Sequence, residues 1–469
     1  MKKKLLLIIS TILICSLVLV ACGGKSEDDK STSQSGSTED QVGKVDDNKD
    51  KDKDKDKDKD KGKDEDKVIN FWHIGTEGHN KEIYDLALEM FNENTDSGYT
   101  IKMTAIQNDK YKEQLVVAMS SGEAPDMFLH WTGGPMIEYI ESGFAQPLDD
   151  LYAKYGLKDK YMEGALAQSS YNDKLYAVPV KGVTVAGIYY NKDLFAKYGI
   201  EVPKTLGELE AACDKFVENG IIPFALANGP KWTGSMYFQN LVARKGGLEP
   251  FKNAAAGNGS FEDDVFVYAG EKIQEWVKKG YFPDGFNAMS EDDGQSRQLF
   301  YREEAAMYLI GSWGTATFQT ETKESGTDFY DKIGWFSFPA IEDSDADPSI
   351  LCGTLGDNFI SFNCTGEKLE AAFEYASYLS SDKMIDYFVN NGIIPVIHGA
   401  EGQITDEITS TIAEAAANAA EVQLWYDQYL SPSIANAHLD GNQEVFGLTM
   451  TPQEANKLMQ DALEEELGK

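Results

Sequence analysis

The sequence predicts an α/β protein, because short apolar runs that suit buried strands alternate with amphipathic helical patterns. This alternation reads strand, helix, strand, helix, strand over residues 68–72, 83–91, 99–105, 111–119 and 127–129. Such an order favours a parallel sheet with helices packed on both of its sides. The 469 residues also exceed what one compact core usually holds, so we expect two lobes or more.

The same alternation resumes in the second half of the chain, where no internal repeat is found. Thr205 and Glu208 have the spacing of a capping box, which predicts a helix that carries Cys213 on its apolar face. Thr451, followed by Pro452, marks the start of the last helix. The remaining patterns predict strands over residues 183–190, 305–310 and 358–362 and a helix over residues 369–379. The chain is therefore expected to be α/β throughout.

The charge balance excludes one large class of partner. The chain has 43 Lys and Arg against 78 Asp and Glu, for a formal net charge of -35. This balance repels phosphate backbones and anionic membrane faces, so we expect no nucleic-acid partner. Hydrophobic residues make up 42% of the chain, which excludes a wholly disordered protein.

The N-terminus indicates export and lipidation. Three lysines precede an apolar run over residues 5–20, which is typical of a secretory signal peptide and too short for a mature membrane span. Leu19-Val20-Ala21-Cys22, followed by two glycines, resembles a bacterial lipobox. We therefore expect a signal peptide over residues 1–21 and a lipid, diacylglycerol and palmitate, on Cys22. The protein would then be anchored in the cell membrane and face the outside.

Residues 22–67 are predicted to be a disordered tether. Between residues 25 and 67 only Val42 and Val45 are apolar, and residues 49–61 alternate strictly between Lys and Asp. Such a segment buries too little surface to offset its ordering entropy. Fully extended, it reaches about 150 Å. A long tether behind a lipobox favours a Gram-positive surface over a periplasm.

Few residues indicate a metal, a cofactor or a disulfide framework. Five cysteines are too few for a disulfide scaffold, although Cys352 and Cys364 could pair or remain free. The five histidines lack metal-ligand spacing. Asp343, Asp345 and Asp347 begin like a calcium loop, but Pro348 and Thr354 replace the Gly and Glu that the loop requires. Phosphate-loop, dinucleotide-binding and nucleophile-elbow motifs are absent from the sequence.

Two loops and several tryptophans predict a binding cleft. Loops 73–78 and 130–134 follow the first and third strands and carry ring side chains beside glycines, where a packed core cannot use them. Trp131, Trp232 and Trp313 lie among Gly, Ser, Thr and Pro, where loops are expected. Indole faces pack on the apolar faces of sugar rings, so these residues suggest a neutral carbohydrate. The alternative is that each tryptophan only fills its loop.

Five segments in sequence order carry a family resemblance. They are Ser-Gly-Glu-Ala-Pro-Asp at residues 121–126, Gly-Phe-Ala-Gln-Pro-Leu-Asp at 143–149, Lys-Leu-Tyr-Ala-Val-Pro at 174–179, Tyr-Tyr-Asn-Lys-Asp-Leu-Phe at 189–195, and Ala-Ala-Met with Gly-Ser-Trp over 305–313. From Val68 onward the chain resembles the extracellular solute-binding proteins of bacterial ABC transporters, in particular the sugar-binding group that includes maltodextrin-binding proteins. Arg302-Glu303-Glu304 departs from the Gly-Lys often seen before Ala-Ala-Met.

The resemblance implies a periplasmic-binding-protein-like clamp of two lobes joined by three chain crossings, near Lys181, Gly353 and Gly399. Lobe 1 would then comprise residues 68–182 and 353–398, and lobe 2 residues 183–352 and 399–469. It further implies a monomer without cofactor or catalytic activity, which binds an oligosaccharide and delivers it to ABC permease subunits.

The resemblance also suggests which residues bind the sugar. The family's ligand positions correspond to Thr76, Glu77, His130, Trp131 and Trp313. Residue type and position add Trp72, His73, Lys181, Trp232, Asp357 and Trp425.

Two alternatives remain open from the sequence alone. A lipid-anchored glycoside hydrolase would require a pair of catalytic carboxylates. The 78 acidic residues of the chain offer many candidates for such a pair. A binding protein for a cationic solute, such as a polyamine, would account for the acidity, and its affinity would fall steeply with salt.

Overall fold

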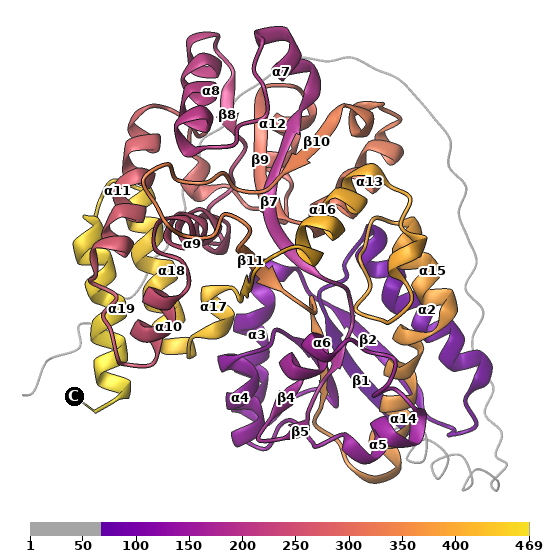
Figure 1. Ribbon diagram of the computed structural model, residues 1–469. Coiled ribbons are helices and arrows are strands. Elements are labelled where there is room, and N and C mark those ends of the chain that lie inside the picture. Colours follow the sequence, from indigo (N-terminus) through magenta and orange to yellow (C-terminus); the bar gives the residue numbers. More distant parts are fainter. Residues whose placement is uncertain (1–66, 469) are drawn as a thin grey trace, which may run out of the picture. The chain divides into compact units, whose positions relative to one another are not determined.

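The computed structural model describes residues 67–468 (Figure 1). The predicted signal peptide, Cys22 and all of the predicted tether except Lys67 therefore lie outside the described residues. The described residues belong to one compact unit, which contains two large hydrophobic cores. None of the helices between residues 67 and 468 combines the length and apolar character needed to cross a bilayer.

The first lobe is built on a five-stranded sheet, with the strand order β2-β1-β3-β12-β6. The first three strands are parallel, as predicted, whereas β12 runs antiparallel to both β3 and β6, so the sheet is mixed. The strands are β1 (Val68–His73), β2 (Thr100–Ala105), β3 (Met127–His130), β6 (Val178–Pro179) and β12 (Phe359–Phe362).

Helices from both ends of the described chain pack together around this sheet. In Figure 1 the orange helices α14 and α15 lie beside the indigo helix α2, although hundreds of residues separate them in sequence. The helices are α2 (Gly78–Asn94), α3 (Asn108–Ser121), α4 (Gly134–Glu141), α5 (Asp149–Tyr155), α6 (Glu163–Gln168), α14 (Gly366–Ser377), η3 (Tyr378–Ser380) and α15 (Asp382–Asn390), with a small hairpin of β4 (Ser170–Tyr171) and β5 (Lys174–Leu175).

The second lobe is built on a six-stranded sheet with β7 at its centre. This strand pairs antiparallel with β9, β10 and β11, while β8 joins β9 and β13 joins β11 in parallel. The strands are β7 (Thr184–Asn191), β8 (Ile222–Phe224), β9 (Ala305–Gly311), β10 (Ile333–Phe336), β11 (Leu351–Thr354) and β13 (Val422–Gln423). The α/β class is thus confirmed in both sheets.

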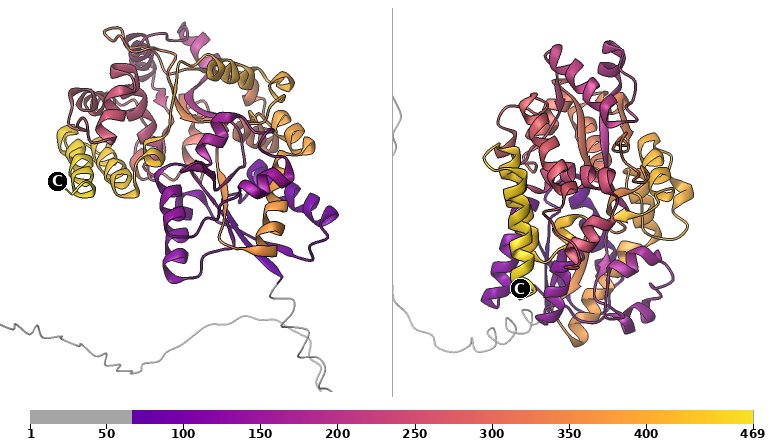
Figure 2. Two further views of the ribbon diagram at one scale, coloured as in Figure 1. Left: turned by 60° about the horizontal axis from the view of Figure 1, so that its bottom comes forward. Right: turned by 60° about the vertical axis from the view of Figure 1, so that its left-hand side comes forward.

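The helices of the second lobe include the two predicted from capping boxes, at Thr205 and Thr451. Figure 2 shows the two yellow C-terminal helices, α18 and α19, packed side by side. The helices are α7 (Lys192–Tyr198), α8 (Leu206–Glu218), α9 (Trp232–Gly246), α10 (Glu249–Ala255), α11 (Asp264–Lys278), η1 (Phe286–Ala288), α12 (Gln295–Tyr301), α13 (Trp313–Ser325), η2 (Phe329–Lys332), η4 (Glu401–Gln403), α16 (Glu407–Ala417), α17 (Tyr426–Tyr429), α18 (Pro432–Phe446) and α19 (Pro452–Glu466).

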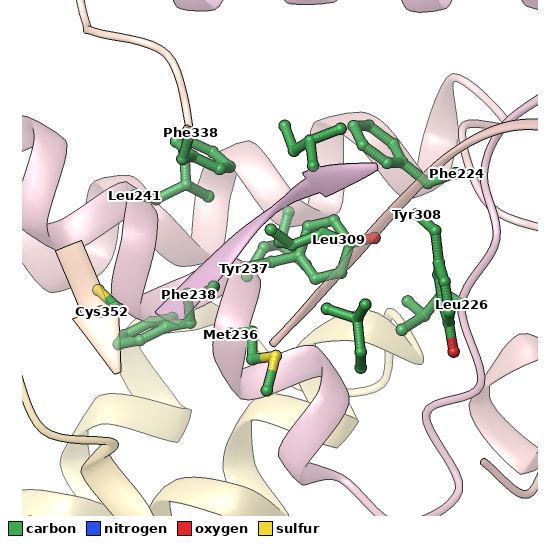
Figure 3. Close-up of a cluster of buried hydrophobic side chains, with 14 of the residues drawn as sticks. Phe224, Leu226, Met236, Tyr237, Phe238, Leu241, Tyr308, Leu309, Phe338 and Cys352 are labelled. Carbon is green, nitrogen blue, oxygen red and sulfur yellow. The ribbon is translucent and has the colours of Figure 1, made fainter. Parts of the chain in front are cut away.

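The core of the second lobe surrounds α9. Tyr237 of this helix packs edge-to-face on Phe224 of β8, with 5.6 Å between ring centres, in the same cluster as Leu309 of β9 (Figure 3). Every residue of α9 from Thr233 to Arg244 is buried. Because no face of this helix meets solvent, its sequence lacks the amphipathic period by which surface helices are recognised.

The described cysteines are all free thiols. Cys213 is buried on α8, as predicted. Cys352 of β11 belongs to the core of the second lobe, whereas Cys364, just after β12, belongs to the core of the first. Since a disulfide joins adjacent Cβ atoms, separate cores exclude the Cys352–Cys364 pairing that the sequence left open.

Candidate functional site

Three backbone segments meet between the two sheets. Lys181 N donates to Asp357 O at 3.1 Å, Asp357 N donates to Gly182 O at 3.0 Å, and Val183 N donates to Ile394 O at 2.8 Å. These residues follow β6, precede β12 and follow α15, so all three segments connect the two lobes. The acceptor of the Val183 N–H is Ile394, which precedes Gly399, the residue near which the third crossing was predicted.

A pocket lies against this junction. Polar and apolar side chains from both lobes line it, with a lysine, a carboxylate, two hydroxyls, an imidazole and an indole among them. Its lining residues are His79, Lys181, Gly182, Val183, Thr184, Ser312, Trp313, Asp357, Gly392, Ile393 and Ile394.

The charged groups of the pocket neutralise one another. Lys181 Nζ donates to Asn80 Oδ1 at 2.6 Å and lies 3.8 Å from Asp357 Oδ2. Burial lowers the pKa of Lys181 and raises that of Asp357, and in each case the partner's charge opposes the shift. A buried pair of opposite charges adds no net charge, which suits a neutral, polar ligand.

The imidazole of the pocket is also uncharged at neutral pH. Burial, with a smaller contribution from the Lys181 ammonium, lowers the pKa of His79 to about 3. His79 lies in the first turn of α2, directly after the loop that holds Thr76 and Glu77. Both of those side chains are exposed at the start of the helix. A neutral imidazole can donate one hydrogen bond and accept another, as a sugar hydroxyl requires.

Three of the predicted tryptophans form a continuous row in the second lobe. The ring of Trp313 lies edge-to-face with Trp232 at 5.8 Å and with Trp425 at 6.1 Å between centroids. A Cβ at Gly311 would come within 2.0 Å of the Trp313 ring, so only glycine leaves room for the indole there. The expectation that Trp232 and Trp313 lie in loops is wrong, because each is the first residue of a helix, α9 or α13.

Trp131 and Trp72 lie in the first lobe. Trp131, directly after β3, packs edge-to-face on Tyr111, and the Lys112 ammonium lies 4.7 Å from the centre of its ring. Tyr111 donates from its hydroxyl to Trp72 O at 3.0 Å. Both tryptophans are half-buried at the ends of neighbouring strands.

The predicted histidines are part of the core of the first lobe. His73 packs 4.3 Å from Tyr84 between ring centres and accepts a hydrogen bond from Gly75 N at 3.1 Å. His130 lies within hydrogen-bonding distance of Trp131 O and of Ser361 Oγ, at 2.9 and 2.8 Å. The expectation that a packed core cannot use these rings is wrong, since both are almost fully buried. Burial lowers the pKa of each to about 4.

The structure thus sorts the predicted residues into four groups. One group lines the junction pocket, the second forms the tryptophan row, the third lies exposed at the start of α2, and the fourth lies at the strand ends of the first lobe. The junction pocket is lined by Lys181, Asp357 and Trp313, and the tryptophan row consists of Trp232, Trp313 and Trp425. The exposed side chains at the start of α2 are Thr76 and Glu77. Those at the strand ends of the first lobe are Trp72, His73, His130 and Trp131. Within residues 67–468 no group of three or more His, Cys, Asp or Glu side chains is placed to hold a metal ion.

Comparison with known families decides the identity of this fold. The family of bacterial extracellular solute-binding proteins matches residues 76–385, which is more than half of the chain. The chain belongs to this family. Its two lobes are therefore those of a solute-binding protein, as the sequence motifs implied.

Relatives of this solute-binding protein match it in part. An uncharacterized ABC transporter extracellular-binding protein of Pyrococcus horikoshii is 29% identical over 266 residues, covering 56% of this chain and 59% of that protein. A probable sugar-binding periplasmic protein of Rhizobium meliloti is 28% identical over 285 residues, covering 59% of this chain and 63% of that protein. In both cases the match spans less than two thirds of the relative.

One solved structure resembles the chain over most of its length. It comes from a study of xylan utilization by the thermophilic bacterium Caldanaerobius polysaccharolyticus. It has a TM-score of 0.76 and 29% sequence identity, and the match covers 84% of this chain and 99% of that one.

Sequence reasoning missed several lining residues of the solute-binding protein's pocket. Thr184 and Ser312 contribute hydroxyls, and Ser312 Oγ also accepts a hydrogen bond from Val185 N at 3.2 Å. Thr184 begins a strand that was predicted from its apolar residues. Nothing in the neighbouring sequence therefore marks the Thr184 hydroxyl as part of a binding pocket. His79 could have been found, because it follows the loop already singled out after the first strand.

Proposed function

We propose that this solute-binding protein is the carbohydrate-binding subunit of an ABC importer. The observation that carries the proposal is the row of three tryptophans bordering a pocket whose charges cancel. Indole faces bind the apolar faces of sugar rings, while hydroxyl, amide and carboxylate groups bind the ring hydroxyls. The descriptions of the Rhizobium meliloti relative and of the xylan study support a sugar as the solute.

The residues divide the work of binding. Trp313 and Trp232 would stack on sugar rings, with the buried Trp425 packed against Trp313, and Lys181 and Asp357 would bind hydroxyls at the junction. Thr76, Glu77 and Trp131 would contact the sugar from the first lobe. Trp72, His73 and His130 stand behind that surface at the strand ends, where they hold its shape.

Capture requires the lobes to part and close again. The lobes of the proposal comprise residues 68–182 and 353–398, and residues 183–352 and 399–469. Bending at Gly182, Asp357 and Ile394 would move them, because the three segments meet there through backbone hydrogen bonds. The solute would leave unchanged for membrane permease subunits, as transport requires.

The N-terminal motif indicates where in the cell the protein would be located. Lipidation of Cys22 would hold the protein, as a monomer, at the outer face of the cell membrane, with residues 22–67 as its tether. Replacing Cys22 by Ala is expected to release the protein into the medium. Fractionation of cells that express either form measures this, and a variant that stays with the membrane fraction would contradict lipid anchoring.

Titration with sugars tests the function itself. Tryptophan fluorescence of the purified protein is followed against xylo-, chito- and malto-oligosaccharides, and each sugar is analysed afterwards for breakdown. A saturable change near micromolar concentration, about -8 kcal/mol, with the sugar intact is the expected result. Breakdown of a sugar would instead identify a hydrolase. Binding of spermidine, with an affinity that collapses in salt, would identify a cation binder.

A further inference from the structure

Helix α3 of the first lobe is capped by a residue of the second lobe. Its own N-cap residue, Gln107, makes no side-chain cap. Instead Asp109 N, in the first turn, donates to Asp292 Oδ2 at 2.8 Å. Asp292 lies in the loop between η1 and α12, so this hydrogen bond joins the two lobes. A carboxylate at a helix N-terminus satisfies a free N–H and is favoured by the helix dipole.

The same contact brings acidic groups together. The carboxylate of Asp109 accepts from Trp232 Nε1 and from Ser290 Oγ, both at 3.4 Å and both in the second lobe. The charged groups that act on Asp292 are Asp109 on α3, Glu291 beside it, and Arg297 on α12. Arg297 already pairs with Glu291 and Glu321, at 2.8 and 3.0 Å. Closure therefore places the Asp292 carboxylate near those of Asp109 and Glu291, while the charge of Arg297 is shared with Glu291 and Glu321.

The loop that carries Asp292 is held firmly by its own lobe. Glu291 is buried, accepts from Ser296 Oγ at 2.9 Å and from the Tyr308 hydroxyl, and is paired with Arg297. Asp292 is thus presented to α3 from a fixed support. Parting of the lobes removes α3, with its N–H and its carboxylate, from Asp292.

We propose that Asp292 is a proton-sensitive latch, which closes the cleft by capping α3 and holds the lobes more tightly when Asp292 carries a proton. In the closed form Asp292 is partly buried and lies near the Asp109 and Glu291 carboxylates, and both conditions favour its protonated form. The latch regulates the proposed binding site and rests on the proposed function only in that closure captures the solute.

The direction of the pH effect follows from the closed structure. Burial raises the pKa of Asp292 to about 6; the Asp109 and Glu291 carboxylates add to the rise, and the Asp109 N–H and Arg297 oppose it. Parting of the lobes removes the Asp109 charge and the burial that α3 contributes, so the pKa of Asp292 falls toward its ordinary value of 3.8. The closed form therefore binds the proton more tightly, and closure is favoured as the pH falls through 6. Between pH 7.5 and pH 5 the ratio of closed to open protein should rise on the order of tenfold.

Small-angle scattering of the purified protein without any sugar tests the latch. The wild type is expected to become more compact as the pH falls from 7.5 to 5. Asp292→Asn keeps an oxygen that accepts the Asp109 N–H but loses the charge, so it should be compact at both values. Asp293→Asn, a neighbouring exposed acid, is the matched control and should behave as the wild type. A wild-type profile without a pH step, or an Asp292→Asn variant that retains the step, overturns the latch.

A second variant and a second measurement keep the result decisive. If Asp292→Asn fails to fold, Asp109→Asn removes the other carboxylate, and the compaction step should move to lower pH; an unmoved step overturns the proposal. With a sugar that binds in the fluorescence titration, affinity should rise on the order of tenfold between pH 7.5 and pH 5, and stay flat in Asp292→Asn. A panel that shows no binding at either pH contradicts the proposed function alone, because scattering still judges the latch.

Discussion

At the junction of the lobes, two backbone segments can touch because residue 182 is a glycine and has no Cβ. A Cβ at this position would lie 1.3 Å from Ile394 O, an atom that belongs to the backbone and cannot rotate away. The sequence placed a crossing near Lys181, but nothing in it marks the following glycine as the contact. The reason lies in the partner, which comes from a segment about two hundred residues later in the chain.

Gly182→Ala is therefore expected to destabilise the protein by about 3 kcal/mol or more, because the methyl group forces the crossing segments apart. The midpoint of urea unfolding measures the change. Gly402→Ala is the matched control, since a Cβ there meets nothing within 4 Å, and its effect should stay within about 0.5 kcal/mol. Equal stability of Gly182→Ala and the wild type would contradict the crowding.

Trp313→Ala is expected to weaken sugar binding by at least about 1–2 kcal/mol, because it removes the central ring of the tryptophan row. Fluorescence or calorimetric titration measures the affinity, and circular dichroism checks that the half-buried position tolerates the change. Trp313→Phe, which keeps an aromatic face, should lose less. An affinity unchanged by Trp313→Ala would remove this residue from the site.

The predicted site residues show what residue type alone can reveal. The small residues beside Trp131, Trp232 and Trp313 predicted a binding cleft, and Trp232 and Trp313 do lie together, with Trp425 next to Trp313. His73 and His130 were selected on the same grounds and are packed into the first core. Residue type suggests what a side chain can do, but burial depends on neighbours that the local sequence does not name.

At the scale of single elements, helix starts were predictable because capping is local. Thr451 Oγ1 accepts from Glu454 N at 3.2 Å, and Glu454 Oε2 accepts from Thr451 N at 2.9 Å. Thr205 and Glu208 form the same reciprocal pair at the start of α8. Both pairs lie within three residues of sequence, so a short window contains all the interactions that define them.

Thr451→Ala is expected to lower the free energy of unfolding by about 1 kcal/mol, since it leaves the first turn of α19 without its side-chain acceptor. Thermal or urea unfolding measures the loss. Thr451→Ser retains the hydroxyl and should remain close to the wild type. An alanine variant as stable as the serine variant would show that the cap contributes nothing here.

Helix α9 was not predicted, for a physical reason. Its residues carry no amphipathic pattern because every side of the helix is buried. The partners of Arg244 lie inside the lobe: it donates from Nε to Phe338 O at 2.9 Å and from Nη1 to Ile350 O at 2.5 Å. These acceptors lie about a hundred residues away, so the sequence near α9 holds no trace of them.

At the scale of the whole molecule, contacts between lobes decide how firmly the cleft closes. Besides the Asp109–Asp292 contact, Lys112 Nζ on α3 lies 2.8 Å from Asp427 Oδ2 on α17. Lys112 is half-exposed and Asp427 mostly buried, with 48% and 10% of their side chains accessible. Salt therefore reaches the lysine, and the pair contributes modestly.

Lys112→Met is expected to weaken sugar binding by up to about 1 kcal/mol at low ionic strength, because it removes one charge of the interlobe pair. The difference in affinity should shrink in 1 M salt, because screening then limits interactions between exposed charges to about 3 Å. Titrations at both salt concentrations measure it. Lys110→Met, on the same helix and exposed, serves as the control. An equal loss in both variants would assign the effect to net charge rather than to the Asp427 contact.

The sequence by itself determined the α/β class, the first parallel strands, the capped helices and the family, because each depends on residues close together in the chain. Only the tertiary structure decided the rest. It placed Cys352 and Cys364 in different cores, brought Ile394 against Gly182, and set Asp292 on the N-terminus of α3. Contacts between distant segments depend on how whole sheets pack, and no local pattern of residues encodes that packing.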